Sequence, residues 1–319
     1  MFVLMYAAVT VLSWGTWIGM ADAVVASNQV KTFYVTLGNL AFAALVLVWH
    51  GDPASWLWLP FAGGLLWAFG NVCAFLGSRG IGLARASGIW TCLNIAMGLV
   101  WGAVLFDEFV GIGARIVVLW LSLASVVAGL LLIVLTRSNV AGADADPVLD
   151  ADGGLGPHPD GRGGVATVDV RAALRSGTYL GLAGAFGAGL LWGSYFIPIQ
   201  LSGTSLWIAN LSLAAGMFVG GTGLAFGSRQ SFVLEQRRDY WVLSLAGALW
   251  GIGNIGMLTL VEEIGTGKGF AIAQLSLVVK GLIGIVVFKN PPPRSRAAAV
   301  TFAGIILAVT GGILLGQLK

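Results

Sequence analysis

The chain carries the stretch LWAFGNVCAFLGSRGI at residues 66–81 and a second version of it, LWGIGNIGMLTLVEEI, at residues 249–264. Both versions belong to a longer match, which pairs residues 64–100 with residues 247–283 without a gap and contains ten identical positions. Shared apolar composition alone does not explain a Trp, a Gly-Asn and an Ile-Gly that recur at one fixed offset. The match therefore predicts an internal duplication.

The two halves of the chain also begin alike. Residues 14–18 read WGTWI, and residues 192–196 read WGSYF. A weaker echo relates Asn39-Leu40 to Asn210-Leu211 in the segment that follows. These pairs extend the predicted duplication to the first helices of each half.

The composition is that of a membrane protein. Hydrophobic residues make up 57% of the chain and charged residues only 10%, with a mean hydropathy of +0.90. Soluble domains contain about 25% charged residues. The net charge of +3 is too small to indicate a nucleic-acid partner. The 13 tryptophans are typical of chains whose indole rings lie at lipid interfaces or line a cavity.

Ten apolar segments are long enough to cross a bilayer, which takes about 17–25 helical residues. We expect an all-α integral membrane protein with a first five-helix repeat at 1–135 and a second at 179–319. Between them, residues 136–178 are rich in Gly, Asp and Ala, which predicts a disordered linker. The segments span residues 2–20, 32–49, 57–77, 82–105, 113–135, 179–199, 206–226, 240–261, 268–288 and 297–316.

The number of helices per repeat predicts an inverted arrangement. Because five is odd, the second copy enters the membrane from the opposite side, so the halves become inverted repeats. Thirteen of the 17 Lys and Arg then lie on one face, three lie on the other, and Lys280 lies within the membrane. The positive-inside rule places the thirteen and the linker in the cytoplasm. We expect a multi-pass protein of the cell membrane with both termini outside.

This arrangement resembles the drug/metabolite transporter superfamily and, in its details, the glucose/ribose porter family of sugar-uptake proteins. Plant-type ureide permeases share the architecture and the long central loop. The resemblance covers all ten segments and implies uptake of a sugar, facilitated or coupled to protons or sodium, without a cofactor. It rests on Trp67-x-x-Gly70-Asn71, Ile81-Gly82, Trp250-x-x-Gly253-Asn254, Ile264-Gly265 and the stretch QLSLVV at 274–279 running to Phe288-Lys289.

Two residues depart from the pattern that the resemblance implies. Asn290 stands where an acidic residue is expected, and Lys280 stands where a small or apolar residue is expected. A lysine near the bilayer centre costs about 2.5–3.5 kcal/mol on insertion scales, so Lys280 marks a functional position. It could bond helix carbonyls or amides, meet an anionic substrate group, or exchange protons. The alternative is extension to the headgroups, which lie roughly 13 Å away.

Polar side chains inside apolar segments are candidates for a binding site between the repeats. The paired Asn71 and Asn254 could bond sugar hydroxyls, or they could join neighbouring helices. Thr91, Asn94 and Gln274 lie deeper in the fourth and ninth segments. We favour Asn94 and Gln274 as cavity residues, because a buried amide without a partner is costly.

Five tryptophans could offer a flat face to a sugar ring, and Trp14, Trp90 and Trp192 are the site candidates among them; the other two are Trp67 and Trp250. An indole offers a flat face to a sugar ring and an N–H donor, although many membrane tryptophans only anchor a helix at the interface. Trp90 is the strongest candidate, because it shares its segment with Thr91 and Asn94. Trp14 and Trp192 stand at corresponding positions at the start of the two halves.

The sequence contains no nucleophile–base constellation, phosphate-binding loop or metal motif, so we expect a transporter and not an enzyme. We expect it to import a small polar solute, a sugar such as glucose or ribose, by alternating access. Its partners are then the lipid bilayer and the solute, and a homodimer is compatible with the sequence. Two alternatives stay open: a permease for a ureide, nucleobase-like or anionic metabolite, and a membrane scaffold or subunit without transport.

Overall fold

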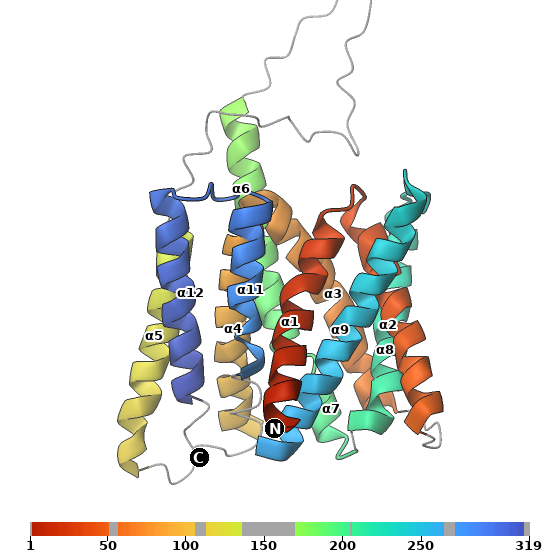
Figure 1. The fold of residues 1–319 in the computed structure, drawn as a ribbon, viewed down its shortest axis with the longest axis horizontal. Helices are drawn as coiled ribbons and strands as arrows, with labels where there is room; N and C mark the ends of the chain where they lie inside the picture. The colour runs from red at the N-terminus through yellow and green to blue at the C-terminus, as the bar shows by residue number, and fades with distance from the viewer. Residues whose placement is uncertain are drawn as a thin grey trace, which may run out of the picture.

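The computed structural model describes residues 2–50, 57–105, 113–135, 170–204, 206–264 and 272–315. Every regular element in these ranges is a helix, and the long helices run side by side in one bundle (Figure 1). A 3₁₀ turn, Gly113–Arg115, precedes α5. The helices are α1 (Phe2–Asp22), α2 (Asn28–His50), α3 (Trp58–Ile81), α4 (Leu83–Leu105), α5 (Ile116–Leu135), α6 (Val170–Trp192), α7 (Ile197–Leu201), α8 (Leu206–Gly227), α9 (Arg237–Ile264), α11 (Ser276–Leu282) and α12 (Arg296–Leu315).

The helices have the length and composition of membrane spans. Within the described ranges, 7 helices are long and apolar enough to cross a bilayer, and two shorter apolar helices cover Ser276–Val287 and Arg296–Gly311. Large apolar side chains such as Trp49, Trp120 and Trp241 lie on the outside of the bundle. An outer surface of this kind is stable in lipid and not in water. The fold is therefore that of an integral membrane protein.

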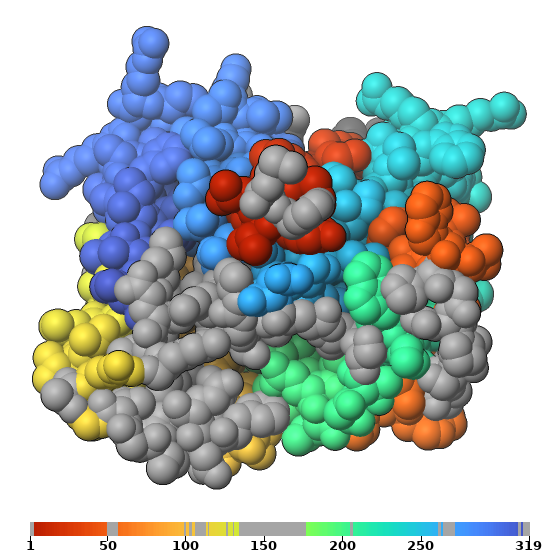
Figure 2. Space-filling model, turned by 60° about the horizontal axis from the view of Figure 1, so that its bottom comes forward, coloured from red at the N-terminus to blue at the C-terminus, as the bar shows by residue number. Residues whose placement is uncertain are grey.

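Helices from the two halves of the chain interleave. The helix α1 packs along α9, and α3 packs along α6. In the same way α2 packs along α9, and α3 packs along α8. The helices α5 and α12 form one edge of the bundle, whereas α2 and α8 lie at the other (Figure 1). Viewed from the end where α1 begins, its first turns lie at the centre of the molecule (Figure 2). Neither half is therefore a separate packing unit.

The repeated tryptophans join these helices through matching hydrogen bonds. Trp192 at the end of α6 donates its indole N–H to the carbonyl of Trp67 in α3, at 3.1 Å. Trp14 in α1 donates its indole N–H to the carbonyl of Trp250 in α9, at 3.3 Å. Both bonds are buried, where an unpaired indole N–H would be costly. The tryptophan of each W-x-x-G-N motif thus accepts a bond from the tryptophan that opens the opposite half.

The glycine of each motif makes room for the same indole ring. A Cβ atom on Gly70 would lie 2.6 Å from Cδ1 and 2.8 Å from Nε1 of Trp192. A Cβ atom on Gly253 would meet Trp14 in the same manner, 2.9 Å from its Nε1. Real Cβ atoms do not approach other atoms so closely, because protein interiors are already close-packed. The motif is therefore a docking site for a tryptophan: one residue accepts its N–H, and the other leaves space for its ring.

The first helix of the second half differs from the expected segment 179–199. Residues 170–178, expected in the linker, already belong to α6, and their sequence VRAALRSGT contains the strong helix formers Ala, Leu and Arg. At the other end α6 stops at Trp192, and residues 193–196 form a turn before α7. Pro198 explains the break, because it has no N–H for the carbonyl of Ser194. The N–H of Ile197 donates to that carbonyl instead, at 3.2 Å.

The expected helix 268–288 is also irregular. Residues 268–271 lie outside the described ranges, and Gln274 and Leu275 form a turn before α11 begins at Ser276. After α11 the residues Ile283–Val287 form a π-helix, which is the wider helix that often occurs at functional positions. The amide of Phe288 donates to the carbonyl of Ile283 at 3.2 Å, which closes this wider turn.

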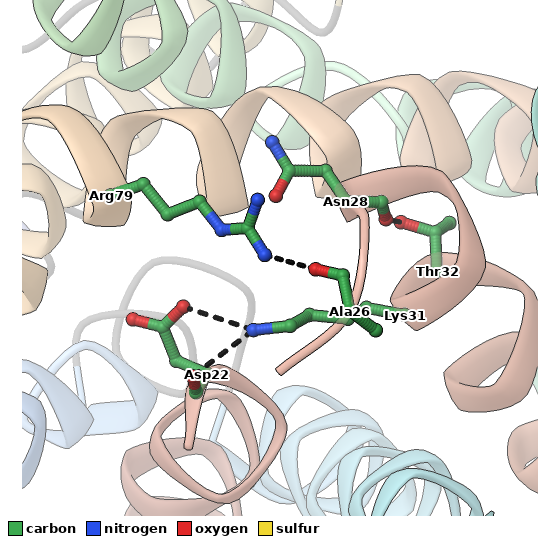
Figure 3. A network of polar contacts seen from close by, with 6 residues as sticks. All are labelled: Asp22, Ala26, Asn28, Lys31, Thr32 and Arg79. Carbon is green, nitrogen blue, oxygen red and sulfur yellow. Dashed lines mark hydrogen bonds and ion pairs between the residues drawn. The ribbon is translucent and has the colours of Figure 1, made fainter. Parts of the chain in front are cut away.

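A polar network joins the ends of α1, α2 and α3 at the end of the bundle opposite to the first turn of α1 (Figure 3). Lys31 is 1% exposed; its Nζ lies 3.6 Å from Asp22 Oδ1 and donates to the Asp22 carbonyl at 3.0 Å. The same Nζ lies 5.4 Å from the ring centroid of Phe75 in α3. Arg79 donates to the carbonyl of Ala26 in the α1–α2 connection. The buried charge of Lys31 is thus fully partnered.

Candidate functional site

A cavity lies where α1, α3, α4, α6, α9 and α11 meet, and tryptophans form most of its wall. We call it the tryptophan cavity. Its water-accessible volume is about 40 Å³. Because one water needs roughly 10–15 Å³ of such volume, the space holds a few water molecules and no sugar ring. The cavity is therefore too small for a sugar in this conformation. Its tryptophans are Trp14, Trp17, Trp67, Trp90, Trp192 and Trp250.

The indole rings leave little free volume in the cavity because they pack on one another. Trp67 lies at the centre, with ring centroids 4.8 Å from Trp250 and 5.8 Å from Trp192. Trp90 packs edge-on against Trp192 at 5.5 Å, and Trp17 lies 6.0 Å from Trp192. Such distances lie within the range of favourable aromatic pairs, roughly 4.5–7 Å. These indole rings now pack on one another. If they moved apart, their flat faces would become available to a ligand.

Two fully buried polar atoms of wall residues have no hydrogen-bond partner among the described residues. They are Nε1 of Trp90 and Oδ1 of Asn94. Trp90 is 0% exposed and Asn94 is 9% exposed, so bulk water does not reach them. Leaving such a group unpaired costs about 1–3 kcal/mol. An unpaired donor and an unpaired acceptor therefore belong to residues of the cavity wall, where a movement of the wall would bring them to a polar ligand or ordered water.

Lys280 brings a cation to the wall. Its side chain is 7% exposed, and its Nζ donates to Ser276 Oγ in the same helix at 3.1 Å. In the part of the chain that the structure describes, no acidic side chain lines this cavity. The described residues thus offer the Lys280 ammonium no counter-ion in this cavity, in contrast to Lys31.

Irregular backbone meets the cavity at two points. Tyr195 lies in the turn between α6 and α7, and Gln274 lies in the turn before α11; both line the cavity. The hydroxyl of Tyr195 donates to Oδ1 of Asn254 at 3.4 Å, which fixes the ring from behind. Broken helices are tolerated at membrane depth where they are buried in protein or line a cavity. In transporters such breaks occur at the substrate site.

Comparison with known proteins identifies the family. The sequence model described as "Sugar transport protein" matches residues 5–148 and 174–318. The chain belongs to this sugar transport family. Two relatives named "Putative sugar uptake protein" come from Enterococcus faecalis, 27% identical over 320 residues, and Listeria monocytogenes, 26% identical over 319 residues. Each alignment covers 99% of this chain and 99% of the relative.

A solved crystal structure shares the fold. It matches with a TM-score of 0.54 and 15% sequence identity, over 99% of this chain and 97% of its own. Together with the apolar helices, family membership identifies a multi-pass membrane protein of the sugar transport family, and it favours a transporter over an enzyme. No three His, Cys, Asp or Glu side chains in the described ranges come together as a metal site would require.

Six of the residues singled out from the sequence come together in this family member's cavity. They are Trp14, Trp90, Asn94, Trp192, Gln274 and Lys280. They belong to α1, α4, α6, the turn before α11 and α11 itself, so only the folded bundle assembles them.

The other three candidates lie outside the cavity wall. Asn71 donates its Nδ2 to Thr32 Oγ1 in α2 at 3.1 Å, which joins two helices. Asn254 lies behind Tyr195 and accepts its hydroxyl. Thr91 is buried in α4, and its hydroxyl has no partner among the described residues. The paired asparagines therefore support the fold and the wall, and neither lines the space.

Four wall residues were not among the residues singled out as the site. Trp67 and Trp250 belong to the repeated motifs, and Trp17 and Tyr195 close the two WGxW/Y stretches. The signal was the repeat itself: Trp17 and Tyr195 occupy corresponding positions three residues after Trp14 and Trp192. Aromatic residues at paired positions of a duplicated chain come together where the two copies meet.

Proposed function

We propose that the chain is a secondary transporter that carries a monosaccharide into the cell by alternating access, with the tryptophan cavity as its binding site. The observation that carries this proposal is a wall of six indoles with an unpartnered N–H on Trp90 and an unpartnered oxygen on Asn94. Indole faces pack against the C–H faces of a sugar, and such polar atoms bond its hydroxyls. The relatives named for sugar uptake support both the solute class and the inward direction.

The small volume of the cavity supports alternating access. In this proposal the space of about 40 Å³ belongs to a contracted state, and the sugar enters only when the rings separate. The interrupted helices α6–α7 and α11 supply positions at which backbone angles can change. In this proposal the breaks beside Tyr195 and Gln274 act as the hinges of that movement.

The proposal includes ten helices in two inverted five-helix repeats. The matching bonds of Trp192 to Trp67 and of Trp14 to Trp250 support it, because each relates one half to the other in the same way. The opposite directions of α1 and α6 in Figure 1 support the inversion. The packing of α1 along α9 is matched by that of α6 along α3. Transporters of this type bind solute between the repeats, near the bilayer midplane.

The orientation in the cell membrane is testable by cysteine labelling. Exposed arginines on the α8–α9 connection and at the start of α12 lie at the end opposite to the first turn of α1, which favours that end as cytoplasmic. We expect a cysteine at position 138 to react with an impermeant maleimide only in opened cells. A cysteine at position 319 should react in intact cells. Labelling of position 138 from outside would reverse the orientation.

Sugar transport itself is testable by ligand-dependent stability. Melting curves of the purified protein should be measured with neutral and acidic monosaccharides, ureides and nucleosides. A true substrate at 100 times its dissociation constant adds about 2.7 kcal/mol to the apparent stability. We expect stabilisation by a monosaccharide and uptake of the same sugar into proteoliposomes. Stabilisation by ureides or nucleosides alone would point to a permease for those solutes. If no solute stabilised the protein, the result would support a membrane scaffold or subunit without transport.

Asn94 allows a sharper test of the site. In Asn94→Leu the unpartnered oxygen is lost, so the protein without ligand should be as stable as the wild type or more stable. Sugar affinity should fall by about two- to tenfold, because one hydrogen bond contributes about 0.5–1.5 kcal/mol. Asn210→Leu is the matched control, since Asn210 is also buried with an unpartnered oxygen but lies outside the cavity wall. An equal loss of affinity in both variants would contradict this role.

A further inference from the structure

The two buried lysines of the described chain differ in their charged partners. Lys31 is 1% exposed and has an ion pair with Asp22, a backbone acceptor and the face of Phe75. Lys280 is 7% exposed and, among the described residues, donates to the hydroxyl of Ser276. An ammonium group carries three N–H donors. At Lys280 donors therefore remain for a group that is not part of the described chain.

In the ranges that the structure describes, no acidic side chain belongs to the wall around Lys280. The wall presents indoles from α1, α3, α4, α6 and α9, the phenol of Tyr195, and the amides of Asn94 and Gln274. Amides and indoles can bond hydroxyls, but they do not neutralise a cation. A buried charge without a partner is strongly unfavourable, so a site of this kind suits a ligand that brings the opposite charge.

Packing does not explain the lysine. In the gapless match of the two halves, Lys280 corresponds to Met97. Met97 in α4 lies against Gly193, whereas in the second half Val279 lies against the corresponding Gly15. The helix contact that Met97 makes is therefore made by Val279, and Lys280 is not needed for it. The first half has no cation at the position that matches Lys280 in the sequence.

We infer that the transported solute is an acidic monosaccharide, a sugar with one carboxylate such as a hexuronate, and that Lys280 binds its carboxylate inside the tryptophan cavity. This inference rests on the proposed function and names the substrate class of the same site. One lysine balances the single charge of a carboxylate, whereas a sugar phosphate near neutral pH carries close to two. The indole faces, Trp90 Nε1 and Asn94 then receive the ring and its hydroxyls. The cation repels an amino sugar.

The test compares sugars that differ only in the acid group. Glucose is paired with glucuronate and galactose with galacturonate, and glucose 6-phosphate is added as a dianion. Affinity is measured from ligand-dependent melting curves, and uptake is measured in proteoliposomes. We expect one uronate to bind at least tenfold more tightly than its neutral partner and than the sugar phosphate.

Lys280→Met then removes the charge and keeps the length of the side chain. The uronate should lose at least tenfold in affinity, while the neutral sugar keeps its own. Lys289→Met is the matched control, because Lys289 is exposed after the π-helix and its substitution makes the same charge change. If Lys280→Met does not fold, Lys280→Gln replaces it, and the melting curve without ligand decides which is used.

The outcomes separate this inference from the function on which it rests. A uronate preference that disappears in Lys280→Met and survives in Lys289→Met supports it. Tight binding of a neutral sugar or a sugar phosphate, or a uronate preference that Lys280→Met leaves unchanged, overturns it and leaves sugar transport in place. Absence of binding by every sugar overturns both.

Discussion

Asp22→Asn is expected to lower the free energy of unfolding by about 3–5 kcal/mol, because it removes the counter-ion of a lysine that cannot reach water. Lys31 is 1% exposed, and its Nζ lies 3.6 Å from Asp22 Oδ1 (Figure 3). The asparagine keeps the size of the side chain and the backbone carbonyl that also accepts from Lys31. The measurement is chemical denaturation of the purified protein in detergent.

Two further variants test whether the charge is the cause. Lys31→Met combined with Asp22→Asn removes both charges, so it should recover most of the stability that Asp22→Asn loses. Arg238→Ala breaks a pair whose arginine is 77% exposed, with the nitrogen 3.6 Å from Asp239 Oδ1. It should change the stability by no more than about 1 kcal/mol. If the double variant is less stable than Asp22→Asn, the pair is not what stabilises this end of the bundle.

Gly70→Ala and Gly253→Ala should each destabilise the protein by about 1–3 kcal/mol and impair transport, because overpacking forces a side chain out of place. A methyl group on Gly70 would lie 2.6 Å from Cδ1 of Trp192, and one on Gly253 would collide with Trp14. The displaced indole loses its bond to the carbonyl of the opposite motif. The measurements are melting temperature and sugar uptake.

Gly223 in α8 is the matched control for both variants. It is exposed, and nothing lies within 4 Å of the Cβ that alanine would add. Gly223→Ala should be neutral or should stabilise the protein by up to about 1 kcal/mol, because alanine has the higher helix propensity. If all three variants behave alike, the glycines of the motifs do not act by making room for the tryptophans.

The sequence predicts much of the packing, because the duplication carries information about contacts. The W-x-x-G-N motif was recognisable at both copies, and the structure shows each copy receiving the tryptophan from the start of the other half. The interruption at 193–196 was not predicted. Hydropathy measures how long a stretch is apolar, whereas a break depends on one missing hydrogen bond at Pro198. A single proline inside an apolar segment is the signal that could have located it.

The site was only partly predictable for a related reason. Lys280 could be recognised because a lysine in an apolar segment has a high free-energy cost of insertion in any orientation. Asn71 and Asn254 share the W-x-x-G-N motif, yet they contact Thr32 and Tyr195, which come from different elements. A sequence motif identifies the asparagine and the helix that carries it. It does not identify the hydrogen-bond partner, because that partner comes from another part of the chain whose sequence differs between the two copies. Trp17 and Tyr195 were recognisable as a pair only through that comparison.

The small size of the tryptophan cavity also bears on the energy balance of the cell. A few water molecules cannot form a water column across a hydrocarbon layer of about 30 Å. Protons cross membranes along such columns, so the tryptophan cavity alone gives them no continuous path in this conformation. A cell can then hold many copies in its membrane without losing its proton gradient through this cavity.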